Sequence, residues 1–491
     1  MHASLRWGGL GLGGLIAGTL LVVMIRAGGV EPRQVDVGNH DVVSVDSGAV
    51  ERLAQALRHR TVTKRNPAAL DTAAYRSLYD YLERAFPRVH QELDTTHVNG
   101  LSRLYTWRGT DPGRPPVVLM AHVDVVPIES DSAWRHPPFS GTVTDEHVWG
   151  RGALDDKSSA VGILEAVSTL LRREVRPPRT IHLAFGHDEE VGGTRGAQAL
   201  ARRVLGRGPA PALVVDEGGA ITQGALPGLD RPLAVVGVAE KGYLSVELTA
   251  TAAGGHSSAP PERTSIEILN EALARLLADP LPARLDGVMG QTLDYVAPEM
   301  NWPMRAALTN RWLTGLGVQW ALSQEPATRA AIRTVQVPTR LQAGVKDNVI
   351  PTAARATINY RILPSHSIQQ VREHIQSAIG DLSVSVEAGQ TSPPTSVSSA
   401  EDSTFRLLQR TVRQVTSDSV IVAPYLVPGA TDSRYYAEAT DHVYRFVPYT
   451  LTPADRGRIH GVNERIAIED YRTVVQYYAQ LIRNADRLPP Q

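Results

Sequence analysis

Histidine and carboxylate side chains follow apolar runs at several places between residues 117 and 219. His122 and Asp124 come directly after one such run, and Glu189 and Glu190 come shortly after another. Imidazole and carboxylate groups are the ligands that a hard or borderline divalent metal takes from proteins. Crowding carboxylates without a cation costs free energy through like-charge repulsion and desolvation. The pattern therefore predicts a metal site.

Two further acidic clusters extend this pattern. Asp155 lies in the glycine-rich turn 150–157, and Asp216 and Glu217 follow the apolar run 213–215. Short, wholly apolar runs are typical of buried strands, and ligands gather at the carboxyl ends of strands in an open α/β sheet. Of the two adjacent acids, either side chain can be the ligand, and the position in the motif favours Glu217.

Strand and helix patterns alternate in the first half of the chain, which predicts an α/β fold with a mixed sheet flanked by helices. The expected strands are 98–107, 117–120, 181–185 and 213–215, and the expected helices are 48–58, 71–86 and 158–172.

From residue 241 the pattern changes to a small α+β layer of ferredoxin-like type, which we expect to form a lid domain. Its expected strands are 244–251, 354–361 and 382–387, and its expected helices are 265–277 and 367–379. An apolar insertion at about 280–345 carries Trp302, Trp312 and Trp320. The predicted divisions are an N-terminal segment 1–30, a catalytic domain 31–238 that resumes at 390–491, and a lid domain 239–389.

The overall composition limits the classes of function. The chain has 491 residues, which suggests two or more domains. The formal net charge of -1 argues against nucleic acid as the main partner. Cysteine is absent, so a metal must be held by histidine and carboxylate ligands.

The segment 7–25 is nearly all apolar or glycine and is flanked by Arg6 and Arg26. This length is sufficient to span a bilayer. We expect an uncleaved signal anchor, with the bulk of the chain on the periplasmic or extracellular side. The alternative is a cleaved signal peptide that releases a secreted protein, although no clean cleavage site follows Ile25.

Taken together, the motifs resemble those of the M20 family of metallopeptidases and aminoacylases. In family order they are Ala-His-Val-Asp, Gly-Arg-Gly-Ala-Leu-Asp-Asp-Lys, Asp-Glu-Glu-Val-Gly-Gly, Asp-Glu-Gly-Gly, Gly-Gly-His-Ser-Ser, Asn-Val-Ile-Pro and His-Gly-Val-Asn-Glu. The resemblance covers nearly the whole chain after about residue 45. Three features, Pro-Pro-Phe-Ser-Gly, Asp-Glu-Gly-Gly and the long lid insertion, are most similar to the branch of carboxypeptidase S and the N-fatty-acyl-amino-acid synthase/hydrolases.

The resemblance implies a zinc-peptidase-like fold and two zinc ions, with Co²⁺ or Mn²⁺ as alternative metals. It also implies a cis peptide bond between Asp155 and Asp156. The ligands implied by motif position are a bridging Asp155, with His122 and Glu217 for one ion and Glu190 and His460 for the other.

The resemblance also implies catalytic and substrate-binding roles. Glu189 would be the general base, and Asp124 would orient His122 from behind. His256 would reach over the site from the lid and stabilise the oxyanion; the alternative is a turn histidine satisfied by the backbone. The residues that would grip a substrate carboxylate are Arg361, Arg434 and Asn348. For Arg361 the alternative is a cross-strand ion pair.

These features predict a di-zinc amidohydrolase that cleaves N-acyl amino acids. Its substrates could include long-chain fatty acyl amino acids, and it could also catalyse the reverse, bond-forming reaction. The alternatives are a Gly-X type metallocarboxypeptidase for short peptides and a binding module without catalysis. For the insertion we weigh two roles, an apolar channel for an acyl chain near the membrane and packing of the lid core. The sequence leaves the oligomeric state open.

Overall fold

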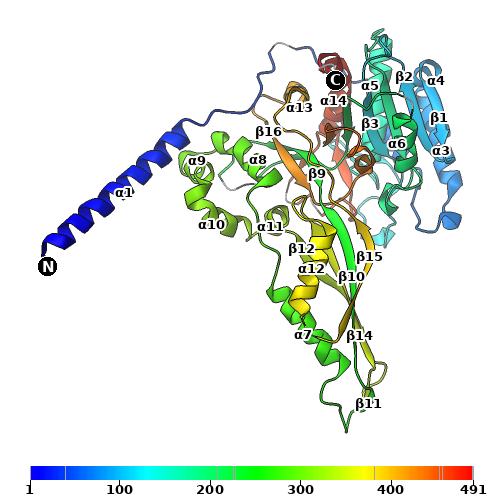
Figure 1. Cartoon of the computed structure of the whole chain (residues 1–491). Coiled ribbons are helices and arrows are strands. Elements are labelled where there is room, and N and C mark those ends of the chain that lie inside the picture. Colours follow the sequence, from blue (N-terminus) through cyan, green and yellow to red (C-terminus); the bar gives the residue numbers. More distant parts are fainter. Residues whose placement is uncertain are drawn as a thin grey trace.

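The computed structural model describes residues 2–38, 40–206, 208–224, 226, 228–380, 382–452, 454–455 and 457–488, and for residues 2–14 it describes only the backbone. A large mixed sheet with its helices forms one end of the molecule, and a narrower sheet extends from it (Figure 1). The predicted α/β class is confirmed.

The main sheet has the strand order β1-β2-β6-β3-β7-β17-β9-β8-β18, with β16 paired to β9. Strands β6, β3 and β7 are neighbours and run parallel, so their carboxyl ends lie at the same edge. The strands are β1 Asp94–Val98, β2 Ser102–Trp107, β3 Val117–His122, β6 Ile181–Gly186, β7 Leu213–Asp216, β8 Ile221–Thr222, β9 Leu233–Glu240, β16 Ile421–Val427, β17 Val443–Arg445 and β18 Thr450–Leu451.

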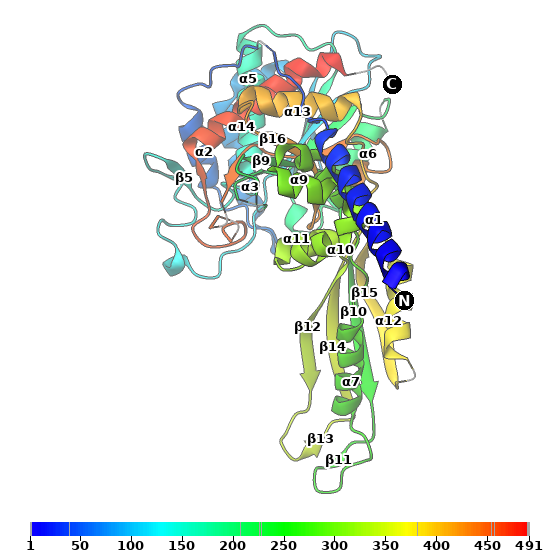
Figure 2. The same ribbon diagram turned by 90° about the vertical axis from the view of Figure 1, so that its left-hand side faces the viewer.

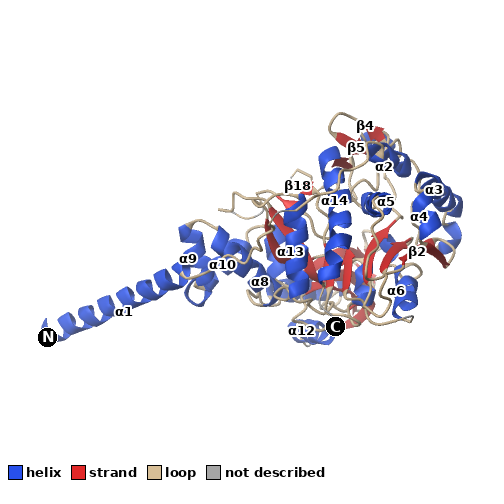
Figure 3. Cartoon of the chain, turned by 90° about the horizontal axis from the view of Figure 1, so that it is seen from above, coloured by secondary structure: helices blue, strands red, loops and turns tan. Residues whose placement is uncertain are grey.

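Helices cover both faces of the main sheet (Figure 3). Leu119 of β3 belongs to the core cluster of α5 and α14, whereas the next residue, Met120, packs with residues of α6. This alternation follows from the period of two in a strand, and both faces are apolar because both are covered. The helices are α2 Ala49–Leu57, α3 Thr72–Ala85, α4 Pro87–Glu92, α5 Lys157–Arg172, α6 Ala197–Leu205, α13 Ser403–Val415 and α14 Ile468–Asn484.

The second sheet, with its two helices, is called the lid unit below. Its antiparallel order β12-β14-β10-β15 and its chain order βαββαβ are those of a ferredoxin-like layer. Fully buried and partly buried residues alternate along β10 and β14, and the buried face packs on both helices. The elements are β10 Gly242–Thr251, α7 Ser265–Ala278, β12 Val335–Ala343, β14 Ala353–Ile362, α12 Ile368–Ile379 and β15 Val384–Ser392. At its far end β11 Gly255–His256 pairs with β13 Val349–Ile350 (Figure 2).

Strand β12 lies inside the stretch that the sequence assigned to the insertion. It is an edge strand that is exposed along most of its length, so it lacks the buried alternation that marks β10 and β14. Pro338 also lies where the register with β14 shifts. Proline inside a strand occurs at edges and bulges and weakens the strand signal. The insertion therefore ends before β12, and the lid unit has one strand more than we predicted.

The insertion helices are α8 Gly287–Val296, α9 Trp302–Thr309, α10 Arg311–Leu322 and α11 Pro326–Ile332. They pack against the main core and not, as one alternative expected, against the lid core. Val288, Leu308 and Ile332 belong to the main cluster. Thr292 Oγ1 donates a hydrogen bond to the Pro424 carbonyl oxygen of β16, at 2.7 Å. The insertion thus extends the main-sheet end of the molecule.

Helix α1, His2–Gly28, contains the predicted anchor segment 7–25. Part of that segment lies outside the residues whose side chains are described. Within the described part of the chain, no helix has the length and hydropathy of a membrane span. The remaining short strands, β4 Thr142–Val143, β5 His147–Trp149 and β19 Arg465–Ala467, form a small sheet beside the loop that carries His460.

Candidate active site

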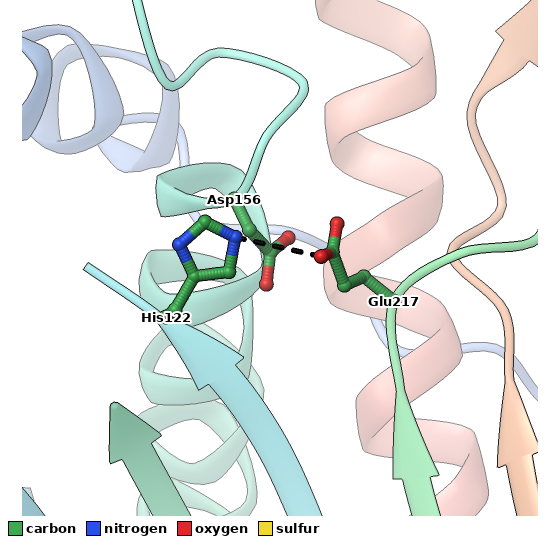
Figure 4. Close-up of side chains that lie close together, drawn as sticks. All are labelled: His122, Asp156 and Glu217. Atoms are coloured by element: carbon green, nitrogen blue, oxygen red, sulfur yellow. Dashed lines mark ion pairs between the residues drawn. The ribbon is translucent and has the colours of Figure 1, made fainter. Parts of the chain in front are cut away.

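His122 is the last residue of β3, between the carboxyl ends of β6 and β7. Its Nε2 atom lies 2.8 Å from Asp155 Oδ1 and 3.5 Å from Glu217 Oε1. Figure 4 shows His122 and Glu217 pointing toward each other from two neighbouring strands, with Asp156 beside them. The expected convergence at this sheet edge is therefore present in the fold.

Asp155 lies between two histidines. Its Oδ1 atom faces His122 Nε2, and its Oδ2 atom lies 2.9 Å from His460 Nε2. Glu190 Oε2 lies 3.2 Å from the same atom of His460. The five side chains predicted as ligands thus form two groups that share one carboxylate, although His460 comes from a loop far away in the sequence.

The donor set fits a pair of divalent cations. Glu190 Oε1 is buried and has no hydrogen-bond partner among the described residues. Burial and the neighbouring Asp155 carboxylate raise the pKa of Glu217 to about 8. Burial also raises the pKa of Glu189. A cluster in which carboxylates are this hard to ionise becomes stable when cations lie between them, and imidazole with carboxylate is a ligand set that zinc accepts.

Asp124 fixes the relative position of two parts of the cluster. Its carboxylate accepts hydrogen bonds from the backbone N–H groups of Glu189 and Glu190, each at 3.2 Å. Its backbone carbonyl accepts from His122 Nδ1 at 3.0 Å, which leaves Nε2 free to face Asp155. Asp124 therefore orients His122 through its carbonyl oxygen and through Oδ1, which lies 3.4 Å from the same Nδ1 atom. Its carboxylate also holds the turn Glu189–Val191.

The choice between Asp216 and Glu217 follows from their directions. Asp216 Oδ2 accepts a hydrogen bond from the Ser433 backbone N–H at 2.7 Å, so this carboxylate is already engaged. Glu217 alone of the two faces the cluster. The peptide bond Asp155–Asp156 is cis, as the motif resemblance implied.

The lid tip carries His256 and Asn348, which lie next to each other. His256 Nε2 is 3.4 Å from Asn348 Nδ2, and His256 Nδ1 is 2.8 Å from Ser258 Oγ. Both residues are exposed, and β11 lies at the end of the lid unit remote from the main sheet (Figure 1). In this single chain the structure does not bring His256 or Asn348 to the cluster, because β10 and β14 carry the tip outward.

Arg361 and Arg434 lie at the opposite end, where the lid unit joins the main sheet. Arg434 is held by the buried carboxylate of Glu240, with Nη2 3.0 Å from Oε2, and it donates to Ser392 Oγ at 2.9 Å. Arg361 makes no ion pair with the described residues and stacks on the ring of its cross-strand neighbour Tyr243, 4.9 Å from the centroid. The expected alternative of a cross-strand ion pair is therefore wrong for Arg361, whose charge is available to a ligand.

Sequence reasoning missed a buried ion pair that joins two ligand-bearing loops. Glu464 Oε2 accepts from Arg151 Nη1 at 2.5 Å, and Glu464 Oε1 accepts from the backbone N–H groups of Leu154 and Asp155 at 2.8 and 3.2 Å. Arg151 Nη2 donates to the His460 carbonyl oxygen at 3.1 Å. Glu464 is the last residue of the His-Gly-Val-Asn-Glu motif, which the sequence reveals. The pairing of Glu464 with Arg151 is not revealed, because the two residues are far apart in the sequence.

We expect Glu464→Gln to destabilise the metal-free protein by about 3 kcal/mol, because it leaves the buried Arg151 charge without its counter-charge. Urea unfolding in the presence of a chelator measures this change. The matched control is Glu469→Gln, which breaks an exposed pair with Arg472 and should cost less than about 1 kcal/mol. Equal unfolding midpoints for the Glu464 variant and the unmodified chain would contradict the positioning role.

Comparison with known proteins decides the family. The model of peptidase family M20/M25/M40 matches residues 118–484. The chain belongs to this family. It is 39% identical to N-fatty-acyl-amino acid synthase/hydrolase PM20D1 of Mus musculus, over 85% of this chain and 84% of that protein. It is 36% identical to probable carboxypeptidase S-like 2 of Dictyostelium discoideum, over 90% of this chain and 86% of that protein.

The fold is shared with solved members of the M20 family. The M20 family metallo-carboxypeptidase Sso-CP2 from Sulfolobus solfataricus superposes with a TM-score of 0.65 at 17% identity, covering 90% of this chain and all of that one. The predicted family and branch are confirmed. This M20 protein is a metal-dependent hydrolase of amide or peptide bonds.

Proposed function

We propose that this M20 hydrolase is a two-zinc enzyme that cleaves N-acyl amino acids, including those with long fatty acyl groups. The observation that carries the proposal is the Asp155 carboxylate, which offers one oxygen to His122 and the other to His460. The names of the PM20D1 relatives favour the acyl substrate, and those of the carboxypeptidase S-like relatives favour short peptides as the alternative.

Five side chains would hold the metals in this proposal. Zinc fits the mixed nitrogen and oxygen donors, and Co²⁺ or Mn²⁺ are alternatives. When bound, such a pair of ions lowers the pKa of a water molecule and polarises the substrate carbonyl. The proposed ligands are His122 and Glu217 on one side, Glu190 and His460 on the other, and Asp155 between them.

Glu189 is the proposed general base. Its carboxylate lies within 4.8 Å of ligand atoms of both His122 and Glu190. A free carboxylate here accepts a proton from the attacking water and then passes it to the leaving amine. Burial raises the pKa of Glu189 above that of an exposed glutamate. Asp124 keeps the base in place through the backbone of its turn.

The substrate carboxylate is proposed to bind at the base of the lid unit. Arg361 has no counter-charge among the described residues, and Tyr243 holds its guanidinium in place. Arg434 adds positive potential, although Glu240 already pairs with it. The oxyanion role of His256, and the contact of Asn348 with the substrate, remain predictions for a state in which the lid tip approaches a cluster.

A substrate panel tests the proposed function. We expect hydrolysis of N-acyl amino acids with acetyl to oleoyl groups, measured by mass spectrometry on the metal-loaded protein. Turnover of dipeptides without turnover of any N-acyl amino acid would instead support the carboxypeptidase. Stoichiometric metal without turnover of either class would support a binding module.

Replacing Trp312 and Trp320 together by alanine should lower kcat/KM for oleoyl substrates about ten-fold or more, given the apolar area that two indoles offer. Both side chains lie on the exposed apolar side of α10, at 58% and 68% exposure. Activity on N-acetyl substrates should change little. The control is Val345→Ala, an exposed apolar residue near the lid tip. An equal loss on both substrates would refute an acyl-binding role.

We also propose that the segment 7–25 anchors the enzyme in a membrane, with the catalytic end outside the cytoplasm. Its apolar composition and its place in one helix support this. The mass of the protein purified from membranes tests it, since an uncleaved anchor retains the N-terminal residues. A mature chain that begins after Ile25 would favour the secreted alternative.

A further inference from the structure

The outward side of α10 is apolar at every exposed position. These positions recur in pairs four residues apart, as on one face of a helix. Leu316 is 84% exposed. A helix on the surface of a soluble protein normally presents polar residues to water, whereas this face presents apolar residues. Its residues, called the α10 face below, are Trp312, Leu313, Leu316, Gly317, Trp320 and Ala321.

The rest of α10 is firmly held, so its orientation is fixed. Val318 is buried in the main core. Arg311 pairs with Asp294 of α8 at 2.8 Å, and Gln319 Nε2 donates to the Ala283 carbonyl oxygen at 3.0 Å. The α10 face is therefore presented outward by a packed helix, and its exposure does not come from loose packing.

The α10 face adjoins α1. Helix α1 packs against α9, where Ala27 is fully buried, and its exposed side carries further large apolar residues such as Leu20 and Ile25. Asn310 links the two surfaces, because Nδ2 donates to the Val23 carbonyl oxygen at 3.3 Å and Oδ1 accepts from Trp312 Nε1 at 3.2 Å. Figures 2 and 3 show α1 leaving the molecule beside α9 and α10.

We propose that the α10 face docks on an anionic lipid bilayer, with the indole rings at the level of the headgroups. One apolar surface made from α10 and α1 needs a cover that extends beyond the protein, which a bilayer provides. Tryptophan is enriched at this depth of membranes. Arg26 on α1 and Arg329 on α11 are exposed, as is Glu325 at the start of α11, and no acidic residue occupies the α10 face. The two arginines complement an anionic lipid surface.

This docking goes beyond the proposed hydrolysis, and it assigns Trp312 and Trp320 to the bilayer as an alternative to the acyl-binding role tested above. It gives the insertion, which packs beside the main core, the role of a membrane-docking element. The proposal concerns α10 itself, because α1 could anchor the chain while leaving α10 in water.

The absence of cysteine allows a local test on the full-length chain. Leu316→Cys carries a polarity-sensitive fluorophore, and the protein is reconstituted into phosphatidylcholine/phosphatidylglycerol vesicles that contain nitroxide-labelled lipids. We expect a blue shift and quenching by nitroxides near the headgroups. Val345→Cys, at a position 94% exposed near the lid tip, is the control and should show neither effect.

A water-like signal at position 316 in vesicles would overturn the proposal, because anchoring by α1 alone predicts that result. Shielding that needs no lipid and grows with protein concentration would also overturn it, since a second copy would then cover the α10 face. Leu313→Asp in the labelled chain should abolish the shift while circular dichroism and the unfolding temperature stay unchanged. Retention of the shift in that variant would count against the α10 face.

Discussion

Glu189→Gln should lower kcat for amide hydrolysis by about 10³-fold or more while leaving the bound metal unchanged. Glutamine has nearly the same shape as glutamate but cannot accept the proton of the attacking water. The turn that carries residue 189 is held by its backbone N–H group on Asp124, and that bond survives the substitution. The loss should therefore appear in kcat and not in metal content.

The measurement is turnover of an N-acetyl amino acid together with elemental analysis of the same preparation. Glu146→Gln, at a side chain 84% exposed, is the matched control and should keep full activity. A Glu189→Gln protein that retains activity would refute the assignment of the general base. Loss of metal in that variant would instead make Glu189 a ligand.

Asp155→Ala should remove both metal ions and all measurable activity. The two oxygens of this side chain face His122 and His460, so it contacts both halves of the cluster. His460→Ala removes a ligand from one half only and should leave about one ion per chain. Elemental analysis after dialysis distinguishes these results.

The test depends on the number of metal ions that each of the two variants retains. The shared position of Asp155 would be contradicted if Asp155→Ala retained one ion, or if His460→Ala lost both. Circular dichroism of each variant shows whether the fold survives, because α5 begins directly after the turn that contains Asp155.

The cluster could be predicted because its geometry follows from local patterns. Short apolar runs mark β3, β6 and β7, and parallel neighbours bring their carboxyl ends together. His460 and the roles of the side chains came from the motif resemblance. Glu464 and Arg151 could not be found in this way, because a buried pair between distant loops leaves no periodic signal in the sequence.

The insertion and the lid unit show where periodicity fails. Strand β12 is exposed along most of its length, so nothing in its composition separates it from a loop. Helix α10 is apolar on most sides, so the sequence does not tell which side packs on the core. The reach of the lid tip depends on how β10 and β14 leave the main sheet. That direction separates His256 from the cluster, and no motif records it.

The most direct test of the account is anomalous X-ray scattering at the zinc edge from crystals of the zinc-loaded protein. We predict two peaks, one beside each oxygen of Asp155, with His122 and Glu217 at the first and Glu190 and His460 at the second. A single peak, or no peak between these side chains in an active and zinc-loaded protein, would contradict the shared-carboxylate centre.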